Sequence, residues 1–153
     1  MPIHTPETVL KDGTDDPDDA CGPYEALLYS DTGGLTQFGA FVEILPPGSA
    51  SALPHWHAEE DEMVYVLEGE VELQEGTDRT LLTPGHAATF KAGVAAGHRL
   101  VNTSDAPVRY MVIGTRATRD VVTYPEHDRV LYHNRDTKTR RYTTLDGSPA
   151  GKP

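Results

Sequence analysis

The chain has 153 residues, enough for one hydrophobic core and too few for two comfortable ones, so we expect a single domain. Its 24 acidic and 13 basic residues give a net charge of −11, which argues against nucleic acid or an anionic membrane as the main partner. Cys21 is the only cysteine, which excludes an internal disulfide and a cysteine-based metal site. No apolar stretch approaches the ~18 residues of a membrane helix, and the N-terminus does not resemble a signal peptide, so we expect a cytoplasmic protein.

The first segment, residues 1–22, is rich in Pro, Asp and Gly and shows no hydrophobic periodicity. Such a composition is typical of irregular structure. We interpret the segment as an N-terminal arm that packs loosely or crosses to a partner subunit.

Residues 23–116 contain a succession of short apolar runs separated by turn residues. The runs are Tyr24–Tyr29, Phe38–Leu45, Met63–Leu67, Val71–Leu73, Thr80–Thr83, Ala87–Phe90, Arg99–Asn102 and Val108–Ile113. Short strands at near-regular spacing, without a convincing helical window, predict an all-β sandwich or barrel. Because only Glu68-Gly69-Glu70 separates the third run from the fourth, these two runs are predicted to form a hairpin.

The hydrophobic pattern weakens from about Arg116. We therefore expect residues 117–153 to be an irregular C-terminal extension that packs on the barrel. The chain would then consist of an arm, a barrel over residues 23–116 and this extension.

Two histidines, His55 and His57, stand one residue apart after Pro54, which favours an extended backbone. Side chains alternate along a strand, so both imidazoles project to the same face. The carboxylate of Glu62 can reach the same point from a neighbouring strand, and His98 lies on a later one. Neutral imidazoles and one carboxylate are a ligand set for a divalent transition metal with coordination positions left open.

Other interpretations of these residues stay open at this point. The histidine pair could be an ordinary surface or core pair, and Glu60 or Asp61 could take the place of Glu62. His98 could be a core histidine that a backbone carbonyl satisfies. The remaining histidines are expected to be exposed to solvent; they are His4, His86, His127 and His133.

Two segments of the chain resemble the sequence motifs of the cupin superfamily. Gly48–Gly69 matches the first motif, in which a glycine precedes His-x-His, a glutamate and a second glycine. Gly85–Asn102 matches the second motif, in which a glycine-rich turn precedes a histidine and, four residues later, an asparagine. The spacer before His55 and the loop before His98 are longer than usual, and Lys91 replaces a proline. None of these departures removes a ligand.

The resemblance implies a cupin-type double-stranded β-helix, that is, a jelly-roll barrel. It also implies that His55, His57, Glu62 and His98 bind one divalent transition metal, which could be Fe, Mn, Ni, Zn, Co or Cu. The stretches 34–39 and 97–105 are similar to small single-domain bacterial cupins that are labelled mannose-6-phosphate-isomerase-like.

The function expected from this resemblance is a metal-dependent enzyme that acts on a small polar organic substrate, of the dioxygenase or the isomerase/lyase type. The alternative is a non-catalytic, metal-stabilised module that binds a small, sugar-like molecule. Glu43, Tyr29 and Tyr110 are candidates for proton transfer. A phosphosugar substrate is less favoured, because no basic pair is clearly directed inward; the basic candidates are Lys91, Arg99 and Arg109. We also expect a homodimer.

Overall fold

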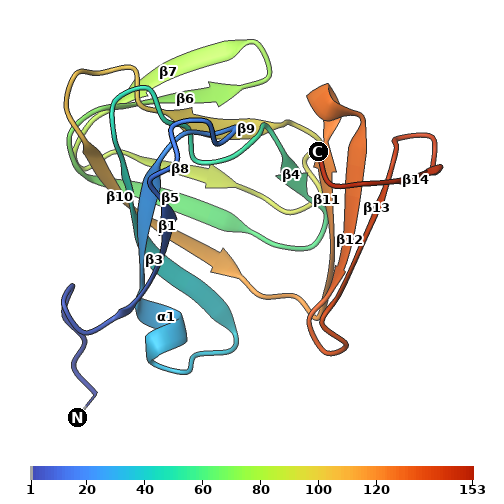
Figure 1. Cartoon of the computed structure of the whole chain (residues 1–153), viewed down its shortest axis with the longest axis horizontal. Helices are drawn as coiled ribbons and strands as arrows, with labels where there is room; N and C mark the ends of the chain where they lie inside the picture. The colour runs from blue at the N-terminus through green and yellow to red at the C-terminus, as the bar shows by residue number, and fades with distance from the viewer. Residues whose placement is uncertain (1) are drawn as a thin grey trace.

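The computed structural model describes residues 2–153 of the chain (Figure 1). In chain order its elements are β1 (Leu10–Thr14), β2 (Tyr24–Leu28), α1 (Tyr29–Thr32), β3 (Phe38–Leu45), β4 (Trp56–His57), β5 (Glu62–Glu68), β6 (Val71–Glu75), β7 (Asp78–Leu82), β8 (Ala87–Phe90), β9 (His98–Val101), β10 (Val108–Thr115), β11 (Arg119–Tyr124), the 3-10 helix η1 (Pro125–His127), β12 (Arg129–Asn134), β13 (Thr139–Thr143) and β14 (Pro149–Ala150). None of the helices in this described range is long and apolar enough to cross a membrane.

The strands form three sheets. One has six strands in the order β1-β2-β3-β10-β5-β8, the second has three in the order β7-β6-β9, and the third has five in the order β14-β13-β12-β11-β4. Neighbouring strands run antiparallel, as the registers of β3, β5 and β10 illustrate. The predicted all-β jelly-roll is therefore confirmed.

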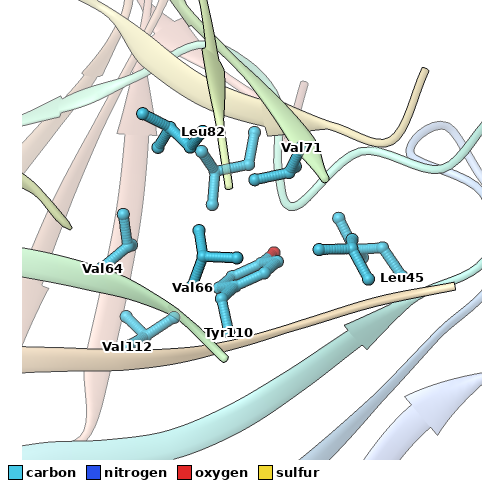
Figure 2. Close-up of a cluster of buried hydrophobic side chains, with 9 residues drawn as sticks. Leu45, Val64, Val66, Val71, Leu82, Tyr110 and Val112 are labelled. Atoms are coloured by element: carbon cyan, nitrogen blue, oxygen red, sulfur yellow. The ribbon is translucent and has the colours of Figure 1, made fainter. Parts of the chain in front are cut away.

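The main core lies between the six-stranded and three-stranded sheets. Side chains alternate along β10, where Val108, Tyr110 and Val112 are buried and the residues between them are less so. The buried cluster is formed by Leu45, Val64, Val66, Val71, Leu82, Leu100, Val108, Tyr110 and Val112. Figure 2 shows the ring of Tyr110 among the aliphatic side chains of this cluster. Tyr110 is thus the one residue of this buried cluster that carries a polar group.

The N-terminal segment is more ordered than the composition of residues 1–22 suggested. β1 is the edge strand of the six-stranded sheet and pairs with β2 of the same chain. Val9, just before it, packs with Leu27 and Val42 in a second, smaller cluster. Backbone pairing and one apolar anchor therefore hold this segment against its own barrel.

The predicted hairpin between Met63–Leu67 and Val71–Leu73 is wrong. β5 pairs with β8 and β10, whereas β6 pairs with β7 and β9 in a different sheet. The chain turns this corner at Gly69, whose φ is +78°. A Cβ at Gly69 would lie 2.8 Å from the carbonyl oxygen of Pro107, so the corner has no room for a side chain.

We expect Gly69→Ala to lower the free energy of unfolding by about 2–5 kcal/mol, since the left-handed backbone costs about 1–2 kcal/mol and overpacking against Pro107 about 1–3 kcal/mol. Gly76→Ala is the matched control: its φ is +54°, but nothing lies within 4 Å of the added Cβ. It should therefore lose only the backbone contribution. Urea denaturation measures both variants, and equal losses would contradict the close packing at Gly69.

The C-terminal extension forms regular strands, whereas the sequence predicted irregular structure for residues 117–153. β11, β12 and β13 pair in succession as antiparallel hairpins, and β14 pairs with β13. Many of their residues are polar, and sequence neighbours such as Val130 and Leu131 are both buried, so these strands lack a regular alternation of apolar and polar residues. β4 joins the same sheet through the pairs Val122–His57 and Thr123–Trp56 (Figure 1, β4 in teal beside the orange β11).

Candidate metal centre

The structure brings the four predicted ligands together. His55 precedes β4 and His57 ends it, Glu62 opens β5, and His98 opens β9. The ring of His55 lies 5.1 Å from that of His57 and 5.2 Å from that of His98, measured between centroids. The Nε2 atom of His98 is 3.5 Å from Oε1 of Glu62. All three sheets thus contribute to one site.

Backbone pairing explains why two of these histidines are neighbours. His55 and His98 form an isolated antiparallel bridge, in which the amide of His98 donates to the carbonyl of His55 over 2.9 Å. Side chains of bridged residues project to the same side of a sheet. A strand pair from distant parts of the sequence therefore fixes the spacing of the two rings.

Hydrogen bonds at Nδ1 orient two of the rings. The Nδ1 atom of His55 lies 2.8 Å from the carbonyl oxygen of Leu53, and that of His57 lies 2.6 Å from Oδ2 of Asp120. Because both partners accept, each Nδ1 carries the proton and each Nε2 keeps a lone pair. Both histidines therefore present the atom that a metal ion requires.

His98 is held by packing instead. Its ring stacks on Phe90 with 3.6 Å between centroids and 2° between planes. The side chain is buried, and its Nε2 atom has no hydrogen-bond partner among residues 2–153. A buried polar atom without a partner is costly and calls for an explanation, and a bound cation would supply one.

The pKa values of these groups follow from burial and from their neighbours. Burial lowers the pKa of His55 to about 4, so its imidazole is neutral at physiological pH. Burial disfavours the charged form of His57 as well, but the hydrogen bond and charge of Asp120 outweigh it and raise the pKa. Burial opposes ionisation of Glu62, but the facing histidines outweigh it and lower the pKa.

Asp120 is a site residue that the sequence did not reveal. It lies on β11, 63 residues after His57, and its side chain is almost fully buried. Its second carboxylate oxygen accepts a hydrogen bond from the amide of Glu59. The one available signal was an acidic residue followed by the apolar pair Val121 and Val122, which indicates a carboxylate on a partly buried strand.

A second group could also hold a cation. His57, Glu60 and Asp120 have ligand atoms within 4.8 Å of one another, and they are the only such group of three in residues 2–153. Both carboxylates are already engaged, however. Glu60 accepts three hydrogen bonds from the guanidinium of Arg135, at 2.7, 3.1 and 3.3 Å, and Asp120 accepts from His57.

Three hollows meet at the predicted ligands. An inner cavity of about 190 Å³ is lined by His55, Glu62 and His98 together with Glu43 and Tyr110. A second hollow of similar volume reaches His57, Glu62 and His98 from the side of Trp56 and Lys91. An open groove of about 500 Å³ includes both Glu43 and Glu62 in its lining. Small molecules can therefore approach the ligands from outside.

Glu43 and Tyr110 form a buried polar pair in the inner cavity. The hydroxyl of Tyr110 donates to Oε2 of Glu43 over 2.5 Å, and only 6% of Glu43 is exposed. Burial raises the pKa of Glu43 to about 7, although the hydrogen bond from Tyr110 opposes this shift. Of the three proton-transfer candidates from the sequence, Glu43 and Tyr110 line the cavity. Tyr29 instead packs against the second, smaller cluster that contains Val9.

The three basic candidates are placed differently from one another. Arg99 lines the inner cavity and donates to Gln74 over 2.9 Å. Lys91 lines the hollow beside His57 and His98. Arg109 alternates with the inward residues of β10 and lies 4.0 Å from Glu68. Lys91 and Arg99 therefore lie in two different hollows beside the predicted ligands and do not form a basic pair.

Comparisons with known proteins agree with this architecture. A family model described as the cupin domain matches residues 41–114. A cupin-superfamily sugar phosphate isomerase from Silicibacter pomeroyi is 32% identical over 98% of this chain and 97% of its own, with a TM-score of 0.88.

A protein assigned as a sugar phosphate isomerase from Acidithiobacillus ferrooxidans is 28% identical over 86% of this chain and 82% of its own, with a TM-score of 0.77. A predicted oxalate decarboxylase from Thermotoga maritima, 19% identical with a TM-score of 0.61 over 75% of this chain and 99% of its own, shares the fold. No curated protein matches the sequence.

Proposed function

The chain belongs to the cupin superfamily, and we propose that it is a metal-dependent isomerase of small hydroxy-carbonyl substrates such as sugars or sugar phosphates. One observation carries the proposal. The buried, unpartnered Nε2 of His98 faces the Glu62 carboxylate beside two histidines whose Nδ1 atoms are anchored. The donor set of His55, His57, Glu62 and His98 suits a divalent transition metal.

The four-residue set fits a metal better than the group of His57, Glu60 and Asp120. Metal binding by Glu60 would break its paired hydrogen bonds to Arg135, and binding by Asp120 would leave Nδ1 of His57 without an acceptor. Binding at the four residues breaks no hydrogen bond formed within residues 2–153 and satisfies Nε2 of His98. Asp120 then acts as the outer carboxylate that orients a metal-bound histidine.

The shape of the inner cavity supports a small polar substrate. A divalent ion held by the four residues would act as a Lewis acid on a carbonyl or hydroxyl oxygen of that substrate. The cavity walls include Phe41, Val64 and Val112, which exclude water, while Ser51 and Arg99 offer hydrogen-bond donors. Lys91 could receive a phosphate group from the second hollow. Apolar walls with a few polar groups are typical of sites that bind and orient a small molecule.

The names of the two similar proteins favour isomerisation over the oxygenase alternative. At 32% and 28% identity over most of the chain, sugar phosphate isomerases are the relatives with the highest structural similarity among those described above. An isomerase needs a proton acceptor beside the metal ligands, and the buried carboxyl of Glu43 offers one.

The proposal is tested with metal-loaded protein and a panel of aldoses, ketoses and their phosphates in D₂O, followed by proton NMR. We expect interconversion of one aldose–ketose pair, with loss of the proton signal at the carbon next to the carbonyl. Thermal stabilisation by a sugar without turnover would instead support the non-catalytic binding module. Oxygen uptake with Fe²⁺ would support a dioxygenase.

Asp120→Asn should weaken metal binding by roughly 10- to 100-fold, because the amide removes the negative charge that fixes the Nδ1 proton of His57. Titration against a chromophoric chelator measures the affinity. Asp136→Asn, an exposed change in the same C-terminal sheet region, is the control and should bind as the wild type does. Unchanged affinity in Asp120→Asn would show that His57 is not oriented for a metal in this way.

A further inference from the structure

We propose that Glu43 is the general base that moves the proton during isomerisation, and that Tyr110 is the positioning residue that holds its carboxyl. The inference rests on the proposed function, since it assigns the proton transfer within that reaction. Neither residue belongs to the predicted metal ligands.

Strand register places the two side chains together on the inner face. Tyr110 on β10 and Glu43 on β3 are direct cross-strand partners, so both project into the barrel. Val66 on β5 is the partner of Tyr110 on its other side, which makes β10 the central strand of this wall. The pair therefore lies on two inner strands of the six-stranded sheet, each with a neighbour on both sides.

Glu43 faces both the predicted ligands and the route from solvent. It lines the inner cavity with His55, Glu62 and His98, and it also lines the open groove with Glu62. A substrate that enters through the groove and reaches the ligands therefore passes the carboxyl of Glu43. A base in this position can act on a carbon next to a carbonyl whose oxygen faces the ligands.

The carboxyl is fixed in a way that leaves one oxygen for chemistry. Oε2 accepts the Tyr110 hydroxyl over 2.5 Å, whereas residues 2–153 supply no hydrogen bond to Oε1. Glu43 also interrupts the apolar sequence Phe41-Val42-Glu43-Ile44-Leu45, where an aliphatic side chain would suit the core better. Burying a carboxyl here costs stability, and polar groups of this kind gather at functional sites.

The proton transfer balances without any further reactant. The Glu43 carboxylate takes the proton from the hydroxyl-bearing carbon next to the carbonyl. The electron pair of that C–H bond forms a carbon–carbon double bond, and the carbonyl π pair moves onto its oxygen, which gives an enediolate. The hydroxyl proton then moves between the two oxygens, and Glu43 returns its proton to the former carbonyl carbon, which completes the isomer.

The test compares metal-loaded wild type with Glu43→Gln, Tyr110→Phe and the control Glu25→Gln, an exposed carboxyl on the adjacent strand β2. Glu43→Gln should lower kcat by roughly 10²- to 10⁴-fold and abolish exchange of the substrate carbon-bound proton with D₂O. Metal content and binding of the corresponding sugar alcohol should stay at wild-type levels. Tyr110→Phe should lower kcat less than Glu43→Gln, and Glu25→Gln should not change it.

Denaturation of the metal-free proteins separates catalysis from a structural role. If Glu43 serves the reaction, the urea midpoint of Glu43→Gln should equal or exceed that of the wild type, because a neutral amide is easier to bury. A lower midpoint with an unchanged kcat would overturn the inference and leave the isomerase function intact. Absence of turnover and exchange in the wild type would overturn both.

Discussion

Glu62→Gln should lose the metal that the wild type retains at about one ion per chain, measured by elemental analysis after expression with each candidate metal in turn. Glutamine keeps the size of the side chain but removes the charge that faces His98 at 3.5 Å. Loss of a direct ligand should exceed the roughly 10- to 100-fold loss that follows removal of an outer partner. His98→Gln should also lose the metal, because the Nε2 atom of His98 is a proposed metal ligand and forms no hydrogen bond within residues 2–153.

Glu60→Gln is the matched control for this result. It makes the same chemical change two residues away. The carboxylate that it removes accepts hydrogen bonds from the guanidinium of Arg135. We expect it to retain the metal. Loss of metal in Glu60→Gln with retention in Glu62→Gln would instead place the ion at His57, Glu60 and Asp120.

Metal addition should stabilise the folded protein substantially. Free metal at 100 times its dissociation constant contributes about 2.7 kcal/mol to the free energy of unfolding. In a chain of this size each kcal/mol shifts Tm by about 2–4 °C, so we expect a rise of roughly 5–10 °C. The proposed ligands come from β4, β5 and β9, which belong to three different sheets, so the ion would tie these sheets together.

Differential scanning calorimetry with metal and with a chelator measures this shift. Glu62→Gln provides the control, because a variant that does not bind the metal should show the same Tm in both conditions. A wild-type Tm that is insensitive to metal and chelator would contradict a site that joins the sheets.

The inward face of the barrel could be predicted because its strands alternate clearly. Val64 and Val66 on β5 and Leu100 on β9 are buried, as the two-residue period of their runs indicates. The same period placed His55 and His57 on one face. The regular spacing of these runs predicted an all-β sandwich or barrel, and the resemblance to the two cupin motifs implied the jelly roll.

Other features depend on contacts that a local pattern does not contain. A Glu-Gly-Glu turn after β5 does not say which sheet the next strand joins, so Gly69 was mistaken for a hairpin turn rather than a corner. The strands of residues 117–153 escaped prediction because many of their residues are polar and their buried residues do not alternate regularly with exposed ones. Asp120 escaped it because only the pairing of β4 with β11 brings it to His57.

The three neighbouring acidic residues differ in their contacts. The Glu60 carboxylate pairs with Arg135, and the Asp61 carboxylate accepts from the amide of Ala92. Of the three, Glu62 is the one that faces His98. Glu62 was also the residue that strand alternation and the cupin motif spacing favoured in the sequence.

Anomalous diffraction from crystals of the metal-loaded protein would locate the ion itself. If His55, His57, Glu62 and His98 bind it, we expect one peak at about 2.0–2.2 Å from Nε2 of the three histidines and from a Glu62 carboxylate oxygen. A peak among His57, Glu60 and Asp120, or no peak near His98, would contradict this assignment.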